Sequence, residues 1–154
     1  MLEPAAAEEA AKRAAPSKTL TTDQCVAAST QAQVLRRRGS FAAERDQLMA
    51  CLDGDCPHAV RDLCSSLLAE LDSAQPTIVF DVKDSRGNDL TAVAVTMEGQ
   101  PFANGLNGAA LPVDPGEHSF GFKVPWQAAV VRSLVTKEGE KARRLRVEIG
   151  AARP

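Results

Sequence analysis

Apolar and small residues recur every three or four positions along residues 20–75, a spacing that predicts helices rather than strands. The first helix is expected to begin after an N-cap at Thr21 or Thr22 and to end at Gly39. The three arginines before this glycine suit a helix C-terminus. A second helix follows from Ser40, and its pattern stops at the next glycine in the chain.

A third helix is expected to start at Pro57, with Asp55 or Cys56 as its cap, since proline is favoured at the first helical position. The expected inward residues are Cys25, Ala28, Ala32 and Leu35 in the first helix, Phe41, Leu48, Cys51 and Leu52 in the second, and Val60, Leu63, Cys64, Leu67, Leu68 and Leu71 in the third. Short loops between the three helices predict antiparallel packing.

Beyond Pro76 the pattern changes to alternation with a period of two, which indicates strands. Six strands are expected, at residues 77–82, 92–97, 109–113, 117–124, 130–137 and 143–149, with turns at 84–89, 98–101, 114–116 and 138–141. Because no helical pattern interrupts them, we expect a small antiparallel sandwich and no parallel sheet.

The change of pattern at Pro76 divides the chain, since proline ends a helix and favours extended geometry in the residue before it. The predicted class is α+β. Residues 1–19 form a disordered leader or linker of low complexity, residues 20–75 a three-helix unit, and residues 76–150 a β-sandwich.

Composition narrows the classes of function. The chain has 154 residues and a net charge of −2, which predicts no general attraction to nucleic acid or to anionic membranes. No run of 18 apolar residues is present, so no transmembrane helix is expected. The leader lacks the apolar core of a signal peptide. Export is therefore expected only if a signal peptide, absent from this sequence, precedes it in the precursor.

The stretch CLDGDCPHAVRDLC, residues 51–64, raises the question of a metal site. Cys51, Cys56, His58 and Cys64 are zinc-ligand types, but zinc sites usually pair their cysteines two to four residues apart. Cys56 and Cys64 would lie along one helix, about 12 Å apart at a rise of ~1.5 Å per residue. This separation argues against a shared metal, and no metal or cofactor is expected.

Four cysteines, Cys25, Cys51, Cys56 and Cys64, allow three disulfide pairings. The Cys56–Cys64 pair is disfavoured because bridged Cα atoms lie within about 7 Å. Two pairings remain, namely Cys25–Cys56 with Cys51–Cys64, and Cys25–Cys64 with Cys51–Cys56. The first is favoured, since the start of the first helix should lie near the start of the third. Disulfides indicate an oxidising compartment.

Two segments resemble known families. The segment GSFAAERDQLMAC, residues 39–51, is similar to the second helix of a tetratricopeptide repeat, except that Glu44 stands where the repeat prefers alanine. Only about one and a half repeats fit, too few for a solenoid groove. The segments VAVTMEGQP and LPVDPGEHSFGFKV resemble PEGA and carboxypeptidase-regulatory-like, or transthyretin-like, sandwiches.

The order of the two units resembles that of uncharacterised exported proteins of myxobacteria and their relatives. This resemblance implies an extracytoplasmic, non-enzymatic module at the cell envelope, periplasmic or on the cell surface. The expected role is structural, with a protein partner or self-assembly.

Two alternatives come from single residues. Trp126 follows Pro125 in a predicted loop, where it either anchors a partner or folds onto the core. The second hypothesis is carbohydrate or surface-polymer binding by the sandwich loops around Trp126 and Asn104–Asn107. Arg144 and Arg146, outward on the last strand, either meet an anionic partner or discourage edge pairing.

A thiol-based enzyme using Cys56 and His58 is the third hypothesis.

Overall fold

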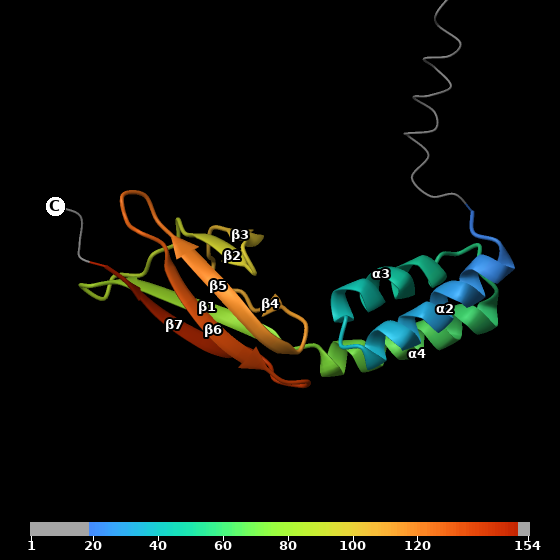
Figure 1. The fold of residues 1–154 in the computed structure, drawn as a ribbon. Coiled ribbons are helices and arrows are strands. Elements are labelled where there is room, and N and C mark those ends of the chain that lie inside the picture. The colour runs from blue at the N-terminus through green and yellow to red at the C-terminus, as the bar shows by residue number, and fades with distance from the viewer. Residues whose placement is uncertain (1–18, 151–154) are drawn as a thin grey trace, which may run out of the picture.

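The structure is a computed structural model that describes residues 19–150, so the predicted leader lies outside the described residues except for Thr19. The chain forms a helical unit and a two-sheet unit that lie end to end (Figure 1). The helices are α2 (Thr22–Arg37), α3 (Phe41–Cys51) and α4 (His58–Ala74). The predicted α+β class, with three N-terminal helices followed by sheets, is confirmed.

The start of α2 is fixed by a capping box, in which the end residues of the first turn satisfy each other's backbone amides. The backbone N–H of Gln24 donates to Thr21 Oγ1 (3.1 Å), and the Thr21 N–H donates to Gln24 Oε1 (2.9 Å). Of the two predicted caps, Thr21 is therefore the one used. At α4 the cap is Pro57 itself, one residue later than predicted.

The helical core is formed by small and apolar side chains that face one another across the three helices. Its buried members are Ala28, Ala32, Phe41, Leu48, Cys51, Cys64 and Leu71. The prediction for Leu63 was wrong, because this side chain remains 43% exposed. Only one face of α4 meets α2 and α3, and Leu63 lies outside that face.

The sandwich has seven strands: β1 (Thr77–Asp84), β2 (Ala94–Met97), β3 (Gln100–Asn104), β4 (Leu111–Pro112), β5 (Gly116–Lys123), β6 (Val130–Thr136) and β7 (Arg143–Ile149). They form one sheet in the order β4-β1-β7 and another in the order β3-β2-β5-β6. The strand β3 was missed, because its start at Gln100 and Pro101 was assigned to a turn.

The pairing of β1 with β7 is parallel, contrary to the expectation of a purely antiparallel sandwich. Phe80 lies opposite Leu145, and Asp81 lies opposite Arg146. All other strand pairs are antiparallel. The first and last strands of the unit are neighbours in one sheet without a crossover helix between them, because the chain runs through the strands of the second sheet before it returns as β7.

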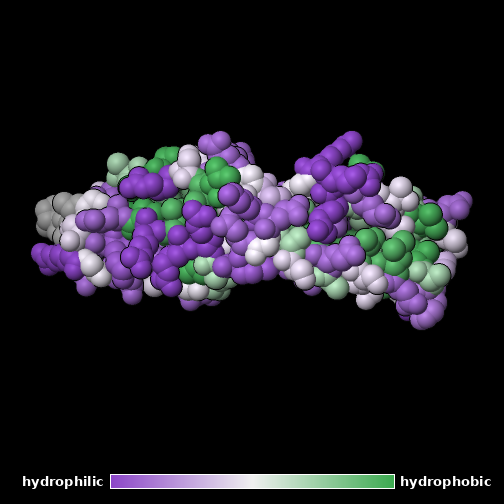
Figure 2. Space-filling view, turned by 90° about the horizontal axis from the view of Figure 1, so that it is seen from below, coloured by the Kyte–Doolittle hydropathy of each residue, from purple (hydrophilic) through white to green (hydrophobic). Residues whose placement is uncertain are grey.

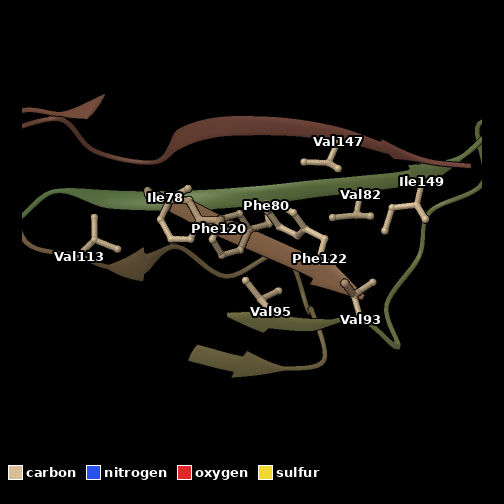
Figure 3. Close-up of a cluster of buried hydrophobic side chains, with 10 residues drawn as sticks. All are labelled: Ile78, Phe80, Val82, Val93, Val95, Val113, Phe120, Phe122, Val147 and Ile149. Atoms are coloured by element: carbon tan, nitrogen blue, oxygen red, sulfur yellow. The ribbon is translucent and has the colours of Figure 1, made fainter. Parts of the chain in front are cut away.

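The sandwich core lies between the two sheets and is centred on Phe80 of β1 (Figure 3). Its ring is in edge contact with the rings of Phe120 and Phe122, at centroid distances of 5.1 and 5.3 Å. Edge-to-face aromatic pairs add about 0.5–1.5 kcal/mol beyond the area that they bury. Valines and isoleucines from β1, β2 and β7 surround these rings.

Hydrogen bonds tie the two units together at the end of α4. The Gln75 side-chain amide donates to the Val113 carbonyl (2.6 Å), and the Gly139 N–H donates to the Ala74 carbonyl (2.9 Å). The Lys141 ammonium group donates to the Asp72 carbonyl (2.6 Å) and also to the Gln75 carbonyl. We define these contacts as the junction.

The loop before β5 also belongs to the junction. One Asp114 carboxylate oxygen, Oδ1, accepts from the Ala42 N–H (2.9 Å) in the first turn of α3, so the sandwich caps a helix of the other unit. The Asp114 carbonyl accepts from Thr136 Oγ1 (2.9 Å) and faces His118 Nε2 (2.6 Å).

Candidate functional site

The cysteines form two disulfides at the end of the helical unit that is far from the sandwich. Cys25 in the first turn of α2 is bonded to Cys56 in the α3–α4 loop, with Cα atoms 5.8 Å apart. Cys51 at the end of α3 is bonded to Cys64 of α4, at 6.3 Å. This is the pairing that the sequence favoured. We call this region the disulfide end.

The disulfides bear directly on the zinc and thiol hypotheses. The four sulfurs are bonded in two pairs, so Cys56 is not a free thiol in this structure. His58 Nε2 lies 3.3 Å from Asp62 Oδ2 one turn along α4, and both side chains are exposed. Within residues 19–150, no group of three or more histidine, cysteine or carboxylate side chains is placed to hold a metal ion.

Three large apolar side chains are exposed at the disulfide end. Val26 follows Cys25, Met49 precedes Cys51 by two positions, and Leu63 precedes Cys64. Their exposed fractions are 45%, 57% and 43%. In Figure 2, apolar patches at this end of the helical unit are separated by polar atoms. Sequence reasoning did not single out Val26 or Met49, because each stands beside a buried cysteine in a helical pattern.

Acidic side chains surround the same end. Asp23 lies in the first turn of α2, Asp53 and Asp55 lie in the α3–α4 loop, and Asp62 lies on α4. Among the described residues, the arginine or lysine at this end is Arg61, whose Nε donates to the Cys56 carbonyl (3.1 Å). Within residues 19–150, the disulfide end therefore combines exposed apolar side chains with more carboxylates than guanidinium or ammonium groups.

The candidate arginines lie on the outer face of the β4-β1-β7 sheet, where they meet a carboxylate. Arg144 NH1 and Arg146 Nε lie 3.4 and 3.8 Å from Asp81 Oδ2. Lys83 Nζ lies 3.8 Å from the other carboxylate oxygen of Asp81, and 2.6 Å from Asp89 Oδ1. The two arginines thus share a single carboxylate in β1, a partner that the sequence did not reveal.

Trp126 lies in the β5–β6 turn and is 75% exposed, so it does not fold onto the core. Its φ of 65° is in the left-handed region, which is uncommon for a residue other than glycine. Such backbone strain persists only where the surrounding structure holds it in place.

Two shallow hollows lie next to this turn. One, of about 570 Å³, is lined by Ala92, Ala94, Asn104, Gly105, Lys123, Val124 and Pro125. The other, of about 450 Å³, extends between β2 and β3 and shares Ala94 and Asn104 with the first. We call the two together the Asn104 groove. The sequence suggested Trp126 and Asn104 as parts of one binding surface, and the structure places Pro125, the residue before Trp126, in the lining of this groove.

His118 is buried and serves the packing of the sandwich. Its Nδ1 lies 3.2 Å from Glu98 Oε2, its Nε2 faces the Asp114 carbonyl, and its ring lies 5.9 Å from that of Phe120.

Comparisons with known proteins give no family to this chain: no family model matches it, and no curated protein matches it significantly. Its function must therefore be inferred from the features described above. None of the described helices is long and apolar enough to cross a membrane.

Proposed function

We propose that this chain is a non-enzymatic protein-interaction module that works outside the cytoplasm, in a bacterial envelope. Two disulfides fit an oxidising compartment, since they are rare in reducing ones. The resemblance to tetratricopeptide-like hairpins, to PEGA-like sandwiches and to exported myxobacterial proteins supports the same location.

The observation that carries the proposal is the group of exposed apolar side chains at the disulfide end. Val26, Met49 and Leu63 belong to three different helices, and each lies within two residues of a disulfide cysteine. The two disulfides already hold these helix ends together, so little conformational entropy would be lost on binding. Preorganised apolar groups of this kind are what protein interfaces use at their centres.

The charge around these side chains indicates the partner. Asp23, Asp53, Asp55 and Asp62 lie in the same helix ends and loop as these apolar side chains, and Arg61 is held against the Cys56 carbonyl. Opposite charges at the rim steer association and select the partner. The partner surface should therefore be apolar at its centre and basic at its rim, as on an amphipathic helix with lysines or arginines beside its leucines.

A synthetic amphipathic peptide of leucines and lysines tests this hypothesis. Its affinity is measured by fluorescence anisotropy for the native protein and for the triple variant Val26→Ser, Met49→Gln, Leu63→Gln. Burying one such side chain is worth about 1.5–3 kcal/mol, and ~1.4 kcal/mol is tenfold in affinity, so the triple variant should bind at least about tenfold more weakly.

The matched control is Val131→Ser with Val135→Ser, which changes two equally exposed valines on β6. This variant should bind the peptide like the native protein. Equal binding by the native protein and the triple variant, with native circular dichroism for both, would rule out the disulfide end as the binding surface.

A second candidate function is carbohydrate binding in the Asn104 groove. The observation that favours it is an exposed indole directly after Pro125, a residue that lines a shallow groove whose one charged lining residue is Lys123. Trp126 is the single tryptophan of the chain, so its fluorescence reports directly on this turn. Titration with soluble peptidoglycan fragments and with lipopolysaccharide should shift this emission if the groove binds them. Asn104→Ala should then weaken the response, and an unchanged spectrum at saturation would remove this candidate.

A further inference from the structure

The β3–β4 connection contains two Asn-Gly pairs, Asn104–Gly105 and Asn107–Gly108, in chemically different surroundings. We infer that Asn107 is a site of spontaneous modification, at which the chain converts the asparagine to aspartate and isoaspartate. We also infer that the fold protects Asn104. This inference is independent of the proposed interaction function.

The reaction needs only the chain and water. The backbone nitrogen of the following glycine attacks the side-chain carbonyl carbon Cγ, a C–N bond forms, and the bond from Cγ to Nδ2 breaks with release of ammonia. The resulting succinimide ring is opened by water at either of its carbonyls. One opening yields aspartate and the other isoaspartate. Asn-Gly is the favourable dipeptide because glycine adds no side chain beside the attacking nitrogen.

At Asn104 the attacking nitrogen is occupied. The Gly105 N–H donates to the Val93 carbonyl (2.9 Å), and the next amide, that of Leu106, donates to the Thr91 carbonyl (2.8 Å). Asn104 is also the last residue of β3 and is paired with Ala94. For its cyclisation, this end of the β2–β3 hairpin would first have to open.

At Asn107 the same groups are free to react. The Gly108 nitrogen has no hydrogen-bond partner among the described residues, and open space surrounds the position where a Cβ would stand. Asn107 Oδ1 accepts from the Ala109 N–H (3.0 Å), which folds the side chain back over Gly108. This hydrogen bond also draws electron density from Cγ, the atom to be attacked. Residues 107–110 are all exposed.

Peptide mapping of the aged protein tests the inference. The full chain is incubated at mildly alkaline pH in water enriched in oxygen-18, and fragment ions then localise the label to Asn104 or Asn107. Label and isoaspartate should accumulate at Asn107 while Asn104 keeps its amide. The rate should rise with pH, because the attacking amide must lose its proton.

Two controls separate the fold from the sequence. In a denaturant the Val93–Gly105 hydrogen bond is lost, so both asparagines should be labelled at similar rates. The variant Asn107→Gln should remove the product from the folded protein, because glutamine cyclises through a less favourable six-membered ring. Equal labelling of the two asparagines in the folded protein would overturn the inference, and so would an unmodified Asn107.

Discussion

Glu44 is buried among apolar residues on the core side of α3, with 1% of its surface exposed. One carboxylate oxygen lies 3.9 Å from Arg36 NH1, and the other, Oε2, has no hydrogen-bond partner among the described residues. Burial raises the pKa of this carboxyl above its usual value, although Arg36 and Arg45 lower it and Glu70 and Glu138 raise it further. The glutamate thus leaves an unsatisfied oxygen in the core.

The raised pKa of Glu44 makes stability depend on pH. Because the folded state holds the proton more tightly than the unfolded state, this group favours folding below pH 4.5, the usual glutamate pKa, and its contribution is lost as the pH rises through the folded-state pKa. Glu44→Gln removes this loss. At neutral pH we expect the free energy of unfolding of the variant to be about 1 kcal/mol higher than that of the native protein. In acid the two free energies should become similar.

Urea unfolding at several pH values measures this difference. The exposed Glu117 provides the control, since Glu117→Gln should change the free energy of unfolding little at any pH. A stability difference for Glu44→Gln that is constant with pH would contradict the assigned cause.

Asp114 caps a helix that has no side-chain cap of its own. Ser40, at the N-cap position of α3, makes no capping hydrogen bond, whereas Asp114 of the sandwich accepts from the Ala42 N–H. Asp114→Ala should lower the free energy of unfolding by about 0.5–2 kcal/mol, as for other lost caps. Asp114→Asn keeps an acceptor oxygen and should lose less. Amide hydrogen exchange at Ala42 locates the effect, and unchanged protection in Asp114→Ala would refute it.

At the scale of elements, each sheet edge carries a feature that hinders pairing with another chain. The edge strand β3 contains Pro101, and β4 is two residues long and contains Pro112. Arg132 of β6 lies opposite Phe120, on the core side of its strand, yet remains exposed. On β7, Arg143 likewise occupies a position on the core side of its strand. Inward charges on edge strands discourage edge-to-edge association, so these edges favour binding through a face over binding by strand addition.

Arg132 also interrupts a strand that is otherwise apolar and rich in valine. Arg132→Val would leave residues 130–136 without a charge, a segment of high β-propensity on an open edge. We expect Arg132→Val to form oligomers or aggregates of higher mass, and Arg132→Lys to keep the mass of the native protein. Size-exclusion chromatography with light scattering measures this, and an unchanged mass for Arg132→Val at high concentration would contradict the role given to the edge charge.

The local signals in the sequence predicted most elements. Thr21, Gly39 and Pro57 marked helix ends to within two residues, because caps and stops depend on neighbours in the chain. Long-range features had no such signal. The burial of Glu44, the cap from Asp114 and the pairing of Arg144 with Asp81 each join residues that are distant in sequence, so they could be recognised only in the folded structure.

On the scale of the whole molecule, the junction determines whether the two units unfold together. Gln75 and Lys141 reach across it with a buried and a partly buried hydrogen bond to main-chain carbonyls, and Lys141 adds an exposed one. The double variant Gln75→Ala, Lys141→Ala should uncouple the units, so that one calorimetric transition becomes two. Lys137→Ala, in the same β6–β7 turn, is the control and should keep a single transition. One transition in the double variant would show that these bonds do not couple the units.

The arrangement of the whole molecule also explains why function was harder to predict than fold. The disulfide end brings together residues near positions 25, 50 and 60, and the Asn104 groove joins β2, β3 and the β5–β6 turn. The cysteines were visible as a cluster in the sequence, and their favoured pairing was found. The exposure of Val26 and Met49 was not predicted, because exposure depends on which helix face the third helix covers.

The parallel pairing of β1 with β7 has a consequence for biosynthesis. Synthesis begins at the N-terminus, so α4 and β1 are complete early. The edge of β1 stays uncovered until the last strand, β7, has been made. Contacts of such long sequence separation form late and slowly. The helical unit can meanwhile collapse and oxidise its cysteines, which all precede β1. We therefore expect a nascent intermediate with closed disulfides and an unfinished sheet, whose open β1 edge is the point at which chaperones would be most needed.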